Sequence, residues 1–73
     1  MGDLRGLSGR DIIRILEKHG FLEVRQKSSH IVMQKKSEER TITVIVPDHK
    51  EIRIGTLYSI IRQSQLPKTE FEK

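Results

Sequence analysis

The order of apolar and polar residues along the chain predicts a helix, three strands and a second helix. In the first segment the apolar residues recur every three or four positions, as on one face of a helix; they are Ile12, Ile13, Ile15 and Leu16. Ser8 is the expected N-cap, and Asp11 three residues later completes an arrangement close to a capping box. Gly20 suits the left-handed residue that follows a helix. We expect this helix over Gly9–His19.

The middle of the chain changes to the two-residue period of β-strands. Three such segments are expected, and they run over Phe21–Gln26, His30–Lys36 and Thr41–Val46. In the second, Ile31 and Met33 face one side, and the even-numbered residues from His30 to Gln34 face the other. In the first, Leu22 and Val24 share one side. The polar stretch between the second and third strands is short enough for a hairpin loop.

A second helix is expected from Gly55 to about Gln65, after a loop that follows the third strand. Its apolar stripe comprises Leu57, Ile60 and Ile61. Proline cannot continue either element, so Pro47 ends the third strand and Pro67 ends the helix. The tail from about Lys68 is polar apart from one aromatic residue, Phe71, which is expected to pin it loosely to the body.

This order predicts an α+β fold, α-β-β-β-α, as in double-stranded RNA-binding domains. A three-stranded antiparallel sheet with both helices on one face buries the two apolar stripes and leaves the other sheet face in water. The 73 residues allow one domain, over 1–73, with a small core of Ile, Leu and Val. Such a core offers no deep cavity, so chemistry is expected on an exposed face.

Charge narrows the possible partners. Fourteen Lys and Arg against ten Asp and Glu give a net charge of +4, which favours nucleic acid because cations displace the counterions of a phosphate backbone. A surface with 33% charged residues is also compatible with solubility alone. There is no cysteine, which excludes disulfides and thiolate metal sites. No apolar run is long enough to span a membrane, and Met1–Arg10 is not a secretory signal. A cytoplasmic protein is therefore expected.

The segment before the second strand carries the best candidate for chemistry. His30 opens that strand directly after a small polar loop, Ser28-Ser29, so its imidazole is expected to be exposed yet held by strand geometry. Three cationic side chains are expected within its reach, those of Arg25, Lys27 and Lys35. The two serines offer hydroxyls and loop amides as hydrogen-bond donors.

These residue types suit RNA cleavage because RNA carries its own nucleophile, the 2′-hydroxyl group. A histidine is then enough to accept or donate a proton near neutral pH, and cations and amides stabilise the charge that develops on the phosphate. No metal ion is required. A lone histidine on a strand is, however, usually a surface residue.

Other sites have weaker support. His19 is explained by the helix C-terminus, where positive charge is favourable, and His49 is a loop residue that could share a surface with His30. His30 and His49 could bind a metal ion only with a third ligand, and the sequence has no motif with the spacing of metal ligands. No serine lies in a G-x-S-x-G turn, which argues against a serine nucleophile. The scarcity of aromatic residues argues against base stacking and favours recognition of backbone and shape.

The start of the second helix is a candidate phosphate contact. Lys50 and Arg53 precede it, and the amides of Gly55 and Thr56 are expected to be free. Free amides and the helix dipole attract anions at a helix N-terminus. The same residues also serve simply to begin a helix.

The chain resembles the HicA toxin family, also called YcfA-like, over nearly its whole length. Four stretches carry the resemblance, and their order and spacing are more specific than any one alone; they are Leu7–Asp11 leading into Leu16–Phe21, Val24–His30, Val44–His49, and Gly55–Leu57 through Ile60–Gln63. The resemblance implies a fold like that of double-stranded RNA-binding domains, metal-free cleavage of messenger RNA, and a HicB-type antitoxin that covers the active face.

The resemblance also assigns residues. The family's K-G-S-H pattern, which contains the catalytic histidine, falls on Lys27–His30, and its P-x-H pattern falls on Pro47–His49, where a supporting role is implied. Ser28 stands where the family has glycine. If that position requires a positive φ, a serine is expected to strain or shift the loop.

Three functional hypotheses follow. The first is an endoribonuclease toxin in which His30 is the catalytic acid or base, and RNA contacts come from Arg25, Lys27, Ser28, Ser29, Lys35, His49, Lys50 and Arg53. The second is a non-catalytic RNA-binding module of the same fold. The third is a protein-interaction domain whose basic face meets an acidic partner. No cofactor is expected in any of them.

Overall fold

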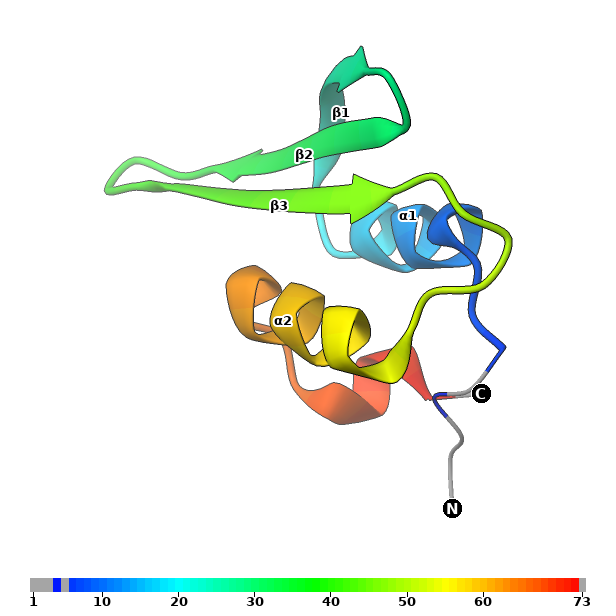
Figure 1. Cartoon of the computed structure of the whole chain (residues 1–73). Coiled ribbons are helices and arrows are strands. Elements are labelled where there is room, and N and C mark those ends of the chain that lie inside the picture. Colours follow the sequence, from blue (N-terminus) through cyan, green and yellow to red (C-terminus); the bar gives the residue numbers. More distant parts are fainter. Residues whose placement is uncertain (1–3, 5, 73) are drawn as a thin grey trace.

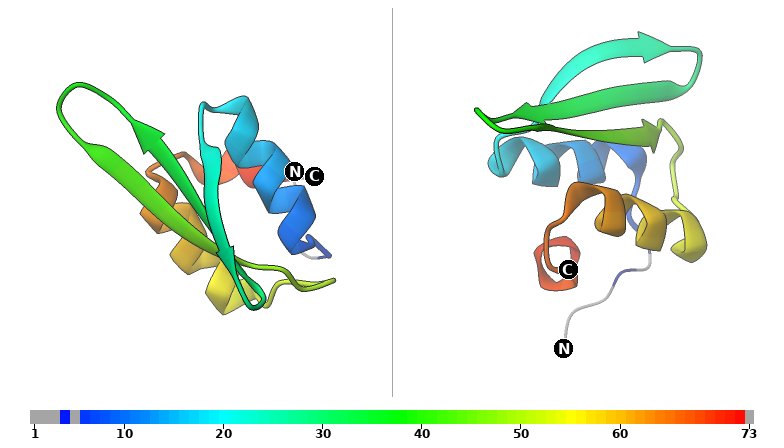
Figure 2. Two further views of the ribbon diagram at one scale, coloured as in Figure 1. Left: turned by 90° about the horizontal axis from the view of Figure 1, so that it is seen from above. Right: turned by 90° about the vertical axis from the view of Figure 1, so that its left-hand side faces the viewer.

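Two helices cover one face of a three-stranded antiparallel sheet and leave the other face open (Figures 1 and 2). The computed structural model describes residue 4 and residues 6–72. Its elements are α1 Gly9–Lys18, β1 Leu22–Lys27, β2 His30–Lys36, β3 Thr41–Pro47, α2 Ile54–Ser64 and the 3-10 helix η1 Lys68–Phe71. The predicted α+β fold, with the order helix, three strands, helix, is confirmed. Met1–Asp3 and Arg5, within the segment tested for a secretory signal, and Lys73 of the expected tail lie outside the described residues.

The N-terminus of α1 is fixed by the predicted capping box. The Ser8 hydroxyl accepts from the Asp11 N–H at 3.0 Å, and the Asp11 carboxylate accepts from the Ser8 N–H at 3.0 Å. That backbone N–H donor, with the Ser8 hydroxyl and Arg14, lowers the pKa of Asp11 below its ordinary value of 3.8. Gly20, with φ +93°, follows the helix as expected.

Gly9 allows α1 to approach the end of β3 closely. Its N–H donates to the His49 carbonyl oxygen at 2.9 Å, and a Cβ at this position would collide with the Pro47 carbonyl oxygen. Only glycine fits there, because backbone atoms leave no room for a side chain. The first turn of α1 is thereby joined directly to the segment that leaves the sheet.

The sheet has the strand order β1-β2-β3, and its two faces differ in composition. Ile31 and Met33 of β2 face the helices and are fully buried, together with Val44 and Val46 of β3. The alternation predicted along β2 is thus confirmed. The opposite side of β2 begins with His30 and stays accessible to solvent.

A β-bulge at Val24 changes the expected course of β1. Glu23 pairs with Met33 and Arg25 pairs with Val32, so Val24 is an extra residue without a partner. Leu22 and Val24 remain 69% and 49% exposed. The bulge therefore keeps the Leu22 and Val24 side chains out of the core. In a regular strand, two apolar residues on the same side could both be buried against the helices.

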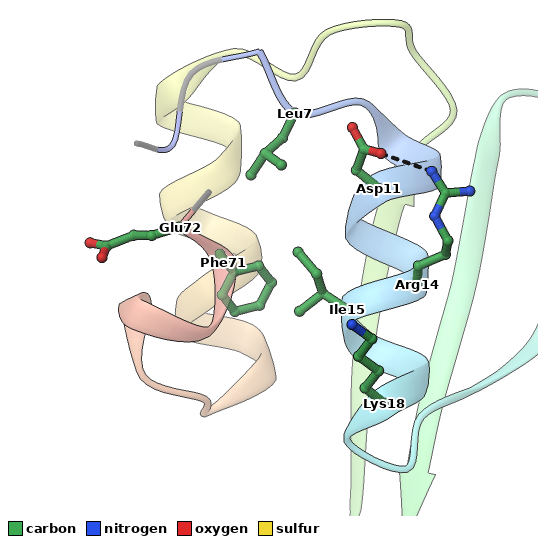
Figure 3. Close-up of a pocket in the computed structure, with 7 residues that line it drawn as sticks. All are labelled: Leu7, Asp11, Arg14, Ile15, Lys18, Phe71 and Glu72. Carbon is green, nitrogen blue, oxygen red and sulfur yellow. Dashed lines mark hydrogen bonds and ion pairs between the residues drawn. The ribbon is translucent and has the colours of Figure 1, made fainter. Parts of the chain in front are cut away.

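The C-terminal segment is more tightly held than the sequence predicts. Instead of a polar tail with a loose anchor, Lys68–Phe71 forms η1 against α1, and the Phe71 side chain is fully buried. His19 Nε2 lies 2.8 Å from Glu70 Oε1, which joins the end of α1 to η1. Between α1 and η1 is a surface hollow of about 360 Å³, called here the helix-side hollow (Figure 3). It is lined by Leu7, Asp11, Arg14, Ile15, Lys18, Phe71 and Glu72.

Helix α2 packs beside β3 and protects the edge of the sheet. Its predicted stripe, Leu57, Ile60 and Ile61, is buried, and the Gln63 side chain accepts from the Ile45 N–H at the edge of β3. Covering an edge donor discourages pairing with another strand. Within residue 4 and residues 6–72, no helix is long and apolar enough to cross a membrane.

Candidate active site on the open face of the sheet

Strand register gathers the central candidates into one hollow on the open face of the sheet. Lys27 pairs with His30, and Arg25 pairs with Val32 one step further along. Directly paired residues share a face of the sheet. These paired residues of β1 and β2, together with the turn and β3, form a hollow of about 460 Å³, which we call the His30 hollow. Its volume lies within the range of ligand sites. Its lining residues are Arg25, Lys27, Ser28, His30, Val32 and Ile45.

The floor and rim of the His30 hollow differ in chemistry. Val32 and Ile45 are paired across β2 and β3 and form an apolar floor, with Ile45 48% exposed. Arg25, Lys27 and His30 are all exposed around it. In the part of the chain that the structure describes, none of these three side chains forms an ion pair. Their charges and donors are therefore available to an anionic ligand.

The turn before His30 has a backbone conformation that favours glycine. Ser28 has φ +56°, in the left-handed region, whereas Ser29 does not. A positive φ in a two-residue hairpin loop favours glycine at that position. The Gln26 side-chain amide donates to the Ser28 carbonyl oxygen at 3.5 Å. The strain expected at Ser28 is thus present, and the turn still pairs Lys27 with His30.

The turn is also attached to the loop after β3. The Asp48 N–H donates to the Ser29 carbonyl oxygen at 2.6 Å, and Asp48 forms an ion pair with Arg10 of α1 at 3.2 Å. The same loop is held to the N-terminus by the Ile52 N–H, which donates to the Leu7 carbonyl oxygen at 2.7 Å. His30 therefore begins its strand beside a turn that is fixed from two sides.

His49 and Arg53 lie in a separate, neighbouring hollow at the start of α2. Pro47, which pairs with His30 in the sheet, also lines this second site of about 280 Å³, together with Thr56. Arg53 is the N-cap residue of α2, and no described side chain caps the helix there. This agrees with the expectation of accessible amides at the helix start. Lys50 is exposed in the loop and lines neither this hollow nor that of His30.

Lys35 does not join the other candidates. It pairs with Ile42 on the helix side of the sheet, and its side chain lies beside Gly20, near the opposite end of β2 from His30. The expectation that Lys35 lies within reach of His30 is not met. The alternation along β2 explains this, because residues 30 and 35 differ by an odd number and face opposite sides.

Two residues that line the candidate site are not predicted from the sequence, the floor residues Val32 and Ile45. Val32 shares the face of His30 by simple alternation, and this signal was available in the sequence. Ile45 required the register between β2 and β3, which no local pattern supplies. Among residue 4 and residues 6–72, no group of three or more His, Asp or Glu side chains is arranged to hold a metal ion.

The arrangement can bind an anion and exchange a proton with it. Arg25, Lys27 and the turn line the same hollow as the exposed imidazole, above a floor that is apolar enough for a base or a sugar. An imidazole can act as either a general acid or a general base. A phosphodiester is the ligand that uses all of these groups together.

Comparison with known protein families identifies the chain more closely. Residues 9–66 match the model of a family described as the HicA toxin of bacterial toxin-antitoxin. The match runs from the first residue of α1 to just beyond α2, so it includes the His30 hollow and the hollow at the start of α2, and it leaves η1 outside. The search of curated proteins found no match.

Proposed function

Because this chain belongs to the HicA toxin family of bacterial toxin–antitoxin systems, we propose that it is an endoribonuclease that cleaves messenger RNA without a metal ion. The observation that supports this most directly is the exposed His30 imidazole beside two cations, Arg25 and Lys27, which form no ion pair with any described residue. Since messenger RNA is the substrate, we expect the protein to act in the cytoplasm.

The proposed reaction is transfer of a phosphoryl group within the RNA. The 2′-oxygen attacks the adjacent phosphorus, the bond from phosphorus to the 5′-oxygen breaks, and the products carry a 2′,3′-cyclic phosphate and a 5′-hydroxyl end. One proton leaves the 2′-hydroxyl group and one is gained by the departing 5′-oxygen. His30 carries out one or both of these transfers as general base or general acid.

Cations around His30 stabilise the phosphate as its negative charge increases. Arg25 and Lys27 are the proposed clamps, since both line the same hollow as the imidazole. The Ser28 and Ser29 hydroxyls and amides offer further donors. His49, Lys50 and Arg53 are proposed to contact the RNA backbone further along, at the start of α2.

Membership of a toxin–antitoxin family implies a protein partner that neutralises the toxin. We propose a HicB-type antitoxin that covers the open face of the sheet. The face offers exposed apolar side chains, Leu22, Val24 and Ile45, beside cations that an acidic surface would complement. Occupation of this face would exclude RNA from His30.

A second candidate function is supported by one specific observation, the positive φ of Ser28. If the strained Ser28 lets the turn move when RNA binds, His30 is displaced from the reacting phosphate. The chain then binds RNA without cleaving it. This alternative uses the same hollow and the same cations but gives no proton transfer.

The test compares the wild type, His30→Ala and a control, His19→Ala, on a long RNA in EDTA. We expect His30→Ala to lower the cleavage rate by about 10²–10⁴-fold, the range for loss of a general acid or base. His19 lies at the end of α1, paired with Glu70, so its replacement should leave cleavage intact. Unchanged cleavage by folded His30→Ala protein would refute the mechanism. If the wild type binds RNA in a salt-dependent manner but does not cleave it, the binding-module function is correct instead.

A further inference from the structure

The open face of the sheet carries a second hollow beside that of His30. It has a volume of about 240 Å³, and we call it the bulge hollow. It is lined by Gly20, Leu22, Val24, Gln34 and Lys36. Leu22 pairs with Gln34, and Gln34 follows Val32 by two residues on the same side of β2. The two hollows are therefore neighbours on one face, and their nearest lining residues on β2, Val32 and Gln34, lie roughly 6–7 Å apart along the strand.

The β-bulge creates the apolar part of this hollow. It exposes Leu22 and Val24 beside each other, 69% and 49% accessible to solvent. Among the described residues, these two and Ile45 are the large apolar side chains exposed on the sheet. Exposed apolar groups that adjoin a ligand site usually serve binding, since they contribute nothing to the core.

The polar part of the hollow suits a nucleotide. The Gln34 amide donates to the Thr43 hydroxyl at 3.2 Å, which orients its carbonyl oxygen, and amide side chains can hydrogen-bond to base edges. Lys36 is exposed, and within residue 4 and residues 6–72 it forms no ion pair. An ammonium group without an anionic partner can bind a phosphate.

We propose that the bulge hollow binds the nucleotide next to the one held at His30. Its base packs on Leu22 and Val24, its edge contacts Gln34, and its phosphate is bound by Lys36. The proposal rests on the proposed RNA substrate. RNA is favoured over a protein ligand because the hollow continues the His30 site and supplies a further unpaired cation, in a chain whose net charge is +4.

The proposal requires a single-stranded substrate at this position. A base must leave its duplex partner before it can pack on side chains. The apolar contacts of the bulge hollow come from aliphatic residues, which tolerate any base. Together these properties predict a subsite that raises affinity for unpaired RNA, with Gln34 as its only contact that distinguishes one base from another.

The first test measures binding of a labelled single-stranded oligouridylate to the His30→Ala protein, so that cleavage does not interfere. Leu22→Ser and Lys36→Gln are each introduced into this background. We expect each to weaken binding several-fold, and Lys36→Gln to lower the slope of log affinity against log salt by about one. The controls are Tyr58→Ser, at an exposed aromatic residue on α2 that is 47% accessible, and Lys68→Gln on η1; both should bind as before.

The second test introduces the same substitutions into protein that retains His30. It measures KM and kcat for RNA cleavage, which separates binding from the chemical step. Leu22→Ser and Lys36→Gln should raise KM and leave kcat unchanged, because the subsite holds a neighbouring nucleotide rather than the reacting atoms. The four substituted side chains are exposed, so folding should be preserved, and circular dichroism checks this.

The outcomes separate this proposal from the proposed function. If wild-type protein binds RNA but the Leu22 and Lys36 variants bind equally well, the subsite is refuted, whereas the proposed function stands. A matching loss of affinity in the Tyr58 and Lys68 controls would also refute it, since the effect would then be non-specific. If the wild type binds no RNA at low salt, the proposed function itself fails.

Discussion

The helix-side hollow and the His30 hollow are similar in size but opposite in the way their charges are arranged. On the helix side, Asp11 and Glu72 balance Arg14 and Lys18, and Arg14 donates to Asp11 at 2.8 Å (Figure 3). The described rim of the His30 hollow contains cations and no carboxylate. The first hollow is electrostatically satisfied, whereas the second attracts an anion.

The floors of the two hollows differ in burial, and this difference also separates a structural side from an accessible one. Phe71 and Leu7 beneath the helix-side hollow belong to the core, and Phe71 is fully buried. Ile45 in the His30 hollow is 48% exposed and has no such role. The comparison indicates that the helix side of the molecule maintains the fold, and that the open sheet face is available to a ligand.

The largest expected effect on stability is on the helix side. Phe71→Ala should lower the free energy of unfolding by about 3–5 kcal/mol, because it removes a fully buried aromatic side chain. Ile45→Ala is the comparison on the open face and should change it by less than about 1 kcal/mol. Urea unfolding followed by circular dichroism measures both. Equal losses would mean that the open face contributes to the core.

The next effect concerns charge. Arg25→Ala combined with Lys27→Ala should weaken RNA binding by roughly tenfold or more and lower its salt slope by about two, since two phosphate contacts are lost. Arg14→Ala combined with Lys18→Ala removes the same net charge from the helix side and should have a far smaller effect. Filter binding over a range of salt concentrations tests this. Equal effects of the two pairs would show that only total charge matters.

A smaller effect is expected in the turn before His30. Ser28→Gly should stabilise the fold by about 0.5–1 kcal/mol, because glycine accepts the positive φ that costs serine energy. Ser29→Gly is the control: Ser29 has no positive φ, so glycine there should not stabilise. Thermal unfolding of the two variants measures the difference. If Ser28→Gly also raises the cleavage rate, the strain affects the position of His30.

The smallest effect is expected from the capping box of α1. Because the Ser8 N–H and its neighbours lower the pKa of Asp11, this carboxylate stabilises the fold above its unfolded-state pKa, near 3.8. That stability is lost as the pH falls through the lowered folded-state pKa. Asp11→Asn should therefore be less stable than the wild type at neutral pH, and the gap should close below about pH 4. Urea midpoints across this range give the result. A gap independent of pH would assign the effect to hydrogen bonding alone.

Much of the fold was predictable because it depends on local patterns. The capping box follows from two residues three positions apart, and the buried stripes of both helices follow from their period. The burial of Ile31 and Met33 follows from alternation within one strand. Each of these signals lies within one segment, where the sequence is a direct guide to structure.

The parts that escaped prediction depend on contacts between distant segments. Phe71 is buried because η1 reaches α1, more than fifty residues earlier in the chain. The bulge at Val24 depends on how β1 pairs with β2, and the exposed position of Leu22 follows from it. The candidate site was predicted around His30, Arg25 and Lys27 because these residues are close together in the sequence, and strand pairing places them in one hollow. Lys35 was wrongly placed beside His30 because it is close to it in the sequence. Strand alternation puts the two residues on opposite faces of the sheet.

The bulge and the turn of the first hairpin also respond differently to changes in chain length. If Val24 were deleted, Glu23 would become the neighbour of Arg25, and the existing pairs with Met33 and Val32 would form a regular ladder. Loss of one residue from Ser28-Ser29 would instead shift the pairing of β1, and a shift of one residue moves Arg25 and Lys27 to the opposite face. Natural variants of this hairpin should accordingly gain and lose residues at the bulge, while the two-residue spacing before His30 stays constant.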